Sequence, residues 1–167
     1  MLLRGFLAVG PVAAIGKPGT DQPELGAARD LVIGEDWLSV VTGEIDEARF
    51  ITLVLGSGAG LHTELRTILA RARFDRICIV VPPVDDAEAT DRLAAVRPLL
   101  AAEQGWGDLP TDRVDGRPIV ALLGVGRRRI VVVGGDRASA YAYAGLGPAV
   151  LAALSQPNPP EPATDAA

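Results

Sequence analysis

The 167 residues are 49% apolar and carry a net charge of −5, a size and apolar content that suit one domain with a buried core. The acidic balance and dispersed arginines argue against a nucleic-acid-binding surface. The single cysteine, Cys78, excludes an internal disulfide and fits a reducing cytoplasm. No segment reaches the roughly 18 uninterrupted apolar residues that span a bilayer.

The hydrophobic periodicity predicts alternating strands and helices. We expect helices over 2–9, 35–48, 61–72, 86–104 and 138–154. Strands are expected over 12–15, 30–33, 50–55, 77–81, 118–123 and 129–133, the last two joined as a hairpin. Residues 105–117 are expected to form a loop. Pro98 is expected to kink or end its helix. Residues 1–16 have too weak a basic region for a secretory signal and favour core elements.

This alternation predicts an α/β fold. We expect a Rossmann-like three-layer α/β/α domain over residues 1–155, with a mostly parallel sheet of about five to six strands, a C-terminal β-hairpin and a final helix. The tail 156–167 is rich in proline and polar residues, which predicts disorder.

The turn GSGAG, residues 56–60, follows the buried strand 50–55. Glycines let backbone N–H groups approach an anion closely, and a helix start adds a favourable dipole. Ser57, Gly58 and Gly60 are therefore candidate ligand-binding residues. The spacing matches neither the dinucleotide fingerprint nor the P-loop, so a turn that is glycine-rich for steric reasons remains the alternative.

Glu64 follows in the first turn of the helix 61–72, beside its apolar stripe. A partly desolvated carboxylate there could hydrogen-bond a ribose or attack an anomeric carbon, which makes Glu64 the candidate catalytic residue. The alternative is a glutamate that only stabilises the helix through its dipole.

The segment 15–30 supplies a second glycine-rich turn after a strand. Gly16, Lys17 and Gly19 in this turn, with Arg29 further on, are candidate ligand-binding residues, because a cation there suits a phosphate or carboxylate. The alternative is a loop that replaces a crossover helix.

His62 is the lone histidine and a further candidate ligand-binding residue. Without a second histidine or a cysteine pair we expect no metal site, and no cofactor is expected. Ser57 and His62 are poorly placed within one turn for a catalytic triad.

The run VAAIGKPGTDQPELGAARDLVIGEDW, a helix, ITLVLGSGAGLHTEL and a closing strand resemble the soluble domain of a poorly characterised bacterial family. Its members often carry membrane helices ahead of this domain. The family in turn resembles TIR, SLOG and nucleoside deoxyribosyltransferase domains, in which a Rossmann-like sheet binds nucleotides. There, a glutamate early in a helix often acts on an N-glycosidic bond. Glu64 matches that glutamate by position, whereas Thr63 departs from the aromatic residue that commonly precedes it.

These observations and the resemblance lead us to expect a cytoplasmic domain that recognises a nucleotide or NAD-derived small molecule in a sensing or regulatory role. Weak N-glycosidase activity through Glu64 is an accompanying hypothesis. The alternative is a non-catalytic module that assembles with itself or with a membrane partner, which exposure of both Tyr141 and Tyr143 in one apolar patch would favour.

Overall fold

The computed structural model describes most of the chain from residue 37 to residue 155 and two short stretches before it. The described residues are 13–15, 28–30, 37–56, 61–72, 74–102, 106, 109–126 and 129–155. No helix within these ranges is long and apolar enough to span a membrane. The expected helix over 2–9, the turn 16–19 and the tail 156–167 lie outside them.

Strands and helices alternate along the first two thirds of the described chain. The strands are β1 (Ala13–Ile15), β2 (Ala28–Asp30), β3 (Ile51–Val54), β4 (Ile77–Val80), β5 (Arg113–Val114), β6 (Arg117–Val125) and β7 (Arg129–Gly134). The helices are α2 (Trp37–Glu47), α3 (Leu61–Arg71), α4 (Asp86–Ala102), α5 (Ala140–Ala144) and α6 (Leu146–Leu154), with a 3₁₀ turn, η1 (Phe74–Arg76), before β4.

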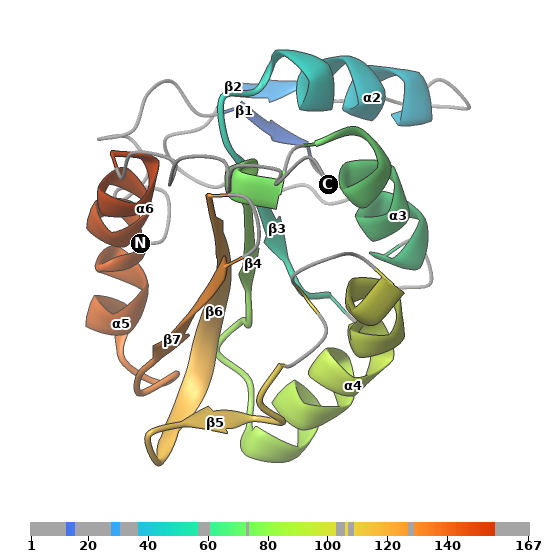
Figure 1. Cartoon of the computed structure of the whole chain (residues 1–167). Coiled ribbons are helices and arrows are strands. Elements are labelled where there is room, and N and C mark those ends of the chain that lie inside the picture. The colour runs from blue at the N-terminus through green and yellow to red at the C-terminus, as the bar shows by residue number, and fades with distance from the viewer. Residues whose placement is uncertain are drawn as a thin grey trace, which may run out of the picture.

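Five of the strands form one mixed sheet (Figure 1). Its order is β3-β4-β6-β5, and β7 also pairs with β6. Among the described strands of this sheet, β3 and β4 form the one parallel hydrogen-bonded pair, whereas β6 pairs antiparallel with β4, β5 and β7. The strands β1 and β2 form a separate parallel pair.

The α/β class is therefore confirmed, but the mostly parallel, Rossmann-like sheet is wrong. The reason lies in the segment between α4 and β6. Trp106 packs edge-to-face on Phe74, next to the start of β4, with ring centroids 5.1 Å apart. Arg113 contacts Asp86, beyond the end of β4. The chain thus travels the length of the sheet before β6 begins, and β6 must enter antiparallel to β4.

A tight turn at Asp115 and Gly116 joins β5 to β6. Both residues have positive φ, 50° and 74°, as a type I′ hairpin turn requires. The Asp-Gly pair is a recognised signal for such a turn, so the expected loop over 105–117 is wrong at its end, where β5 and this turn lie. The hairpin predicted from the next two strands is present, with β7 paired to β6.

Helices cover both faces of the sheet (Figure 1), and each face has its own core. One cluster joins apolar residues of α2, α3 and α4 to Ile77 and Ile79 of β4. The other joins α5 and α6 to Cys78 and Val80 of the same strand. This alternation buries both sides of β4. Burial also raises the pKa of the Cys78 thiol to about 12, which fits a core residue and not a nucleophile.

Proline and glycine act differently in the last two long helical segments. Pro98 lies inside α4, which continues to Ala102, so of the two outcomes expected for this proline, a kink or an end of the helix, the end is excluded. The expected single helix over 138–154 is divided at Gly145 into α5 and α6.

Replacing Gly43 by alanine is expected to raise the free energy of unfolding by about 0.5–1 kcal/mol. Gly43 lies exposed within α2, and an added Cβ would meet nothing within 4 Å, so only the helix propensity changes. Gly116 provides the matched control, because its surroundings are equally open but its φ is +74°. Gly116→Ala should instead destabilise the protein. Urea unfolding of both variants checks the opposite signs.

Candidate functional site

The carboxyl ends of three strands lie at one edge of the sheet. β3 and β4 are parallel, and β7 runs in the same direction because β6 is antiparallel to both β4 and β7. The chain leaves these strands to form α3, α4 and α5, which therefore begin near this edge (Figure 1). Carboxyl ends of strands are the usual ligand-binding edge of open α/β sheets.

Glu64 lies in the first turn of α3 at this edge and is half-buried. Desolvation raises the pKa of its carboxyl group above the usual value. Within the described ranges, no hydrogen bond or ion pair reaches this carboxyl. A carboxyl that is partly desolvated without a compensating partner is typical of a functional site.

The structure describes only two of the other predicted site residues, His62 and Arg29. His62 is exposed on α3. Arg29 is the middle residue of β2, in the separate two-stranded sheet, where its backbone pairs with Ala14. The turn residues of both glycine-rich segments lie outside the described part of the chain, namely Gly16, Lys17, Gly19, Ser57, Gly58 and Gly60.

Arg92 is a residue at this edge that the sequence analysis missed. It lies on α4, and its side chain is only 16% exposed. Its Nη1 donates to the carbonyl oxygen of Leu55, just after β3, at 2.6 Å, and its Nη2 pairs with Glu88. A signal was present, because Arg92 is spaced three residues from Ala89 and four from Val96 on the buried face of α4.

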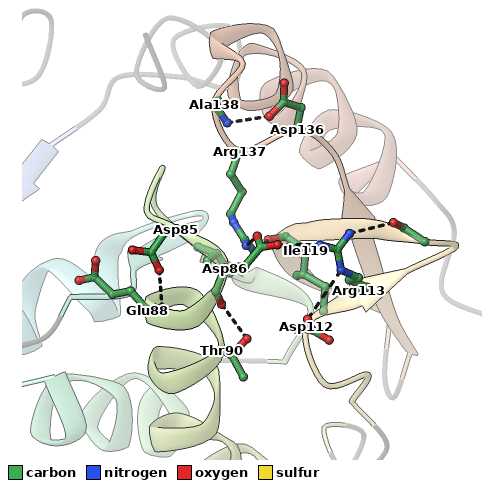
Figure 2. A network of polar contacts seen from close by, with 12 residues as sticks. Asp85, Asp86, Glu88, Thr90, Asp112, Arg113, Ile119, Asp136, Arg137 and Ala138 are labelled. Atoms are coloured by element: carbon green, nitrogen blue, oxygen red, sulfur yellow. Dashed lines mark hydrogen bonds and ion pairs between the residues drawn. The ribbon is translucent and has the colours of Figure 1, made fainter.

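A second arginine, Arg137, connects the end of β7 to the start of α4 (Figure 2). Among the described residues it is the one charged side chain that is fully buried. Its guanidinium pairs with Asp86 and donates to the carbonyl oxygen of Ile119 at 3.3 Å. Asp86 also accepts a hydrogen bond from Arg113 at 2.6 Å. No local pattern could have predicted this network, since Asp86 and Arg137 are far apart in the sequence.

Tyr143 closes the end of β4 from the opposite face of the sheet. Its hydroxyl donates to the carbonyl oxygen of Val81 at 2.9 Å, and burial raises the pKa of the phenol. Tyr141, which precedes it by two residues on α5, is 83% exposed. The two tyrosines therefore do not form a joint exposed patch.

The chemistry available at this edge among the described residues is that of Glu64, a carboxyl group without an assigned partner, and of arginines that are paired with other carboxylates. Glu64 can accept hydrogen bonds or exchange a proton, while Arg92 and Arg137 hold strand ends. The described residues contain no group of three His, Cys, Asp or Glu side chains that could hold a metal ion.

No protein-family model, curated protein or solved structure matches this chain. The resemblance to the TIR, SLOG and deoxyribosyltransferase domains therefore stays a prediction.

Proposed function

We propose that the domain recognises a nucleotide or NAD-derived small molecule at the carboxyl edge of β3 and β4, in a sensing or regulatory role. The observation that carries the proposal is Glu64, a half-buried carboxyl with a raised pKa and no partner in the described part of the chain. Adjacent ribose hydroxyls are hydrogen-bond donors that such a carboxyl can accept from, which would compensate for its desolvation.

Thermal shift with NAD, ADP-ribose and cyclic dinucleotides tests the proposal. A ligand at about 100 times its Kd stabilises the folded state by about 2.7 kcal/mol, and for a chain of this length Tm should rise by roughly 5–10 °C. Glu64→Gln is expected to weaken binding about 10- to 100-fold, since a charge-assisted hydrogen bond is lost. Glu47→Gln, an exposed change on α2, is the control and should bind like wild type. No shift with any ligand would exclude the proposal.

The same Glu64→Gln variant should show a characteristic pH dependence of stability. The raised pKa means that folding favours the protonated carboxyl. This contribution is fully present below the pKa of the unfolded chain and is lost as pH rises through the higher pKa of the folded state. Glu64→Gln lacks this loss, so its stability relative to wild type should increase as pH rises from about 4 through the raised pKa of the folded state. Urea unfolding across this range measures the difference.

Hydrolysis of an N-glycosidic bond is a second candidate function. The raised pKa of Glu64 favours it, because a carboxyl that titrates closer to neutral pH is a better proton donor and acceptor. Release of free base from NAD, followed chromatographically, should occur with wild type and disappear with Glu64→Gln. Release by both proteins at equal rates would exclude Glu64 as its cause.

The interaction module is the remaining alternative. It would be favoured by an apolar patch that includes both tyrosines, but Tyr143 is buried. Large exposed apolar side chains among the described residues are Val54, Val131 and Tyr141. Sedimentation at high protein concentration distinguishes this alternative, since a monomer that binds ligand supports recognition and a ligand-free oligomer supports assembly.

A further inference from the structure

The hydrogen-bond ladder between β3 and β4 ends at a proline. Val54 pairs with Val80, and the N–H of Leu55 donates to the carbonyl oxygen of Val80 at 2.9 Å. In a parallel ladder, the carbonyl of Leu55 would next accept from the N–H of residue 82. That residue is Pro82, which has no N–H. The strand that leads toward α3 therefore ends in a carbonyl that its neighbour strand cannot satisfy.

Arg92 supplies the missing donor. Its Nη1 lies 2.6 Å from the Leu55 carbonyl oxygen, and its Nη2 is held by Glu88. The backbone N–H of Glu88 donates in turn to the side chain of Asp85 at 2.8 Å, which fixes the first turn of α4. These contacts thus connect the start of α4 to the end of β3, the strand that precedes α3.

The placement of Arg92 is specific, because an arginine on a helix can usually extend its charge into water. Here the side chain is largely buried, and its Nε has no hydrogen-bond partner among the described residues. Leaving that donor unsatisfied is unfavourable. The guanidinium is nevertheless held at Leu55, the last described residue before α3 whose backbone hydrogen-bonds to β4.

We propose that Arg92 is a positioning residue for the site at this edge: it replaces the N–H that Pro82 lacks, fixes the exit of β3, and thereby sets where α3 places Glu64. The description of this place as a ligand site rests on the proposed function. The replacement of the missing donor does not rest on it, and it can be tested without any ligand.

A double-mutant cycle between Arg92→Met and Pro82→Ala tests the replacement. The Pro82→Ala change restores an N–H, so the loss of Arg92 should matter less in that background. We expect Arg92→Met to lower the folding equilibrium constant about 10- to 100-fold when Pro82 is present, and at least about threefold less in the Pro82→Ala background. Equal losses in both backgrounds would overturn the proposal. If Arg92→Met does not fold, Arg92→Lys, which keeps the charge but loses the guanidinium fork that joins Leu55 to Glu88, takes its place in the cycle.

The pKa of Glu64, measured by NMR of its side-chain carbon, tests the positioning. Arg92→Met should loosen the end of β3, expose Glu64 and lower that pKa toward its usual value, and Pro82→Ala should restore it. Arg97→Met is the matched control, because Arg97 lies on the same helix and also donates to main-chain carbonyls, those of Leu109, Pro110 and Thr111. Arg97→Met should reduce stability without moving the pKa of Glu64. An unchanged pKa in Arg92→Met, or an equal change in Arg97→Met, would contradict the proposal.

Different results would contradict the proposed function and the proposed role of Arg92. If the cycle and the pKa behave as expected but no nucleotide binds, Arg92 positions Glu64 and the proposed function is wrong. If ADP-ribose binds wild type and Arg92→Met equally and the cycle shows no coupling, the proposed function stands and the role of Arg92 is wrong.

Discussion

Gly124→Ala is expected to lower the free energy of unfolding by about 3 kcal/mol, as overpacking of a rigid core does. Gly124 is the penultimate residue of β6, where it pairs with Ile130 of β7. An added Cβ would lie 2.0 Å from the main-chain carbonyl oxygen of Phe74. That carbonyl belongs to η1, which leads directly into β4, and Trp106 packs on the Phe74 ring. Neither η1 nor β6 can move away from the other without disturbing the core.

Urea unfolding measures this loss, and two further variants identify its cause. The clash involves the main chain, so Phe74→Ala should not rescue Gly124→Ala. Gly134→Ala should be milder, because the nearest atom to its Cβ is the side-chain Cγ1 of Val114 at 2.8 Å, which can rotate away. A cost below about 1 kcal/mol for Gly124→Ala, or full rescue by Phe74→Ala, would contradict the close contact of η1 with β6.

Asp86→Ala is expected to lower the free energy of unfolding by about 2–3 kcal/mol. Arg137 is 5% exposed, whereas the Asp86 side chain is 58% exposed. Removing Asp86 therefore leaves a buried cation without its counter-charge. Water can partly replace the exposed carboxylate, so the loss should fall below the full cost of a completely buried unpaired charge.

Removing the other partner should have the smaller effect. Arg137→Met eliminates the buried charge and keeps apolar volume, and Asp86 retains Arg113 and the solvent. We expect a loss of no more than about 1 kcal/mol, and Asp86→Ala should add little in the Arg137→Met background. Asp46→Ala, which breaks the exposed pair with Arg71, serves as control and should cost much less than Asp86→Ala. Additive losses from Asp86 and Arg137 would contradict a direct pairing.

Local periodicity was sufficient for the elements that build the candidate site. The helix expected over 61–72 is Leu61–Arg71, and the strand expected over 77–81 is Ile77–Val80. Both depend on apolar residues whose spacing is a property of the segment itself. The same reasoning placed Glu64 beside the buried stripe of its helix, where the structure finds it half-buried.

The direction of β6 could not be predicted from local periodicity. It depends on the path of the segment before it, which is fixed by the edge-to-face packing of Trp106 on Phe74 and by hydrogen bonds from Arg97 to three carbonyl groups. These contacts join residues from separate elements, and no period in the sequence encodes them. The role of Arg92 likewise becomes visible only when the register of β3 and β4 shows which carbonyl Pro82 leaves without a donor.

The central claim is that a nucleotide-type ligand binds at the carboxyl edge of β3 and β4. The most direct measurement is the change in backbone amide NMR shifts when ADP-ribose is added to the ¹⁵N-labelled protein. We expect changes concentrated at residues 55–56, 61–65 and 84–86, and we expect them to be weakened in Glu64→Gln. Changes confined to β7 and α6, or no changes with ADP-ribose, NAD or a cyclic dinucleotide, would contradict it.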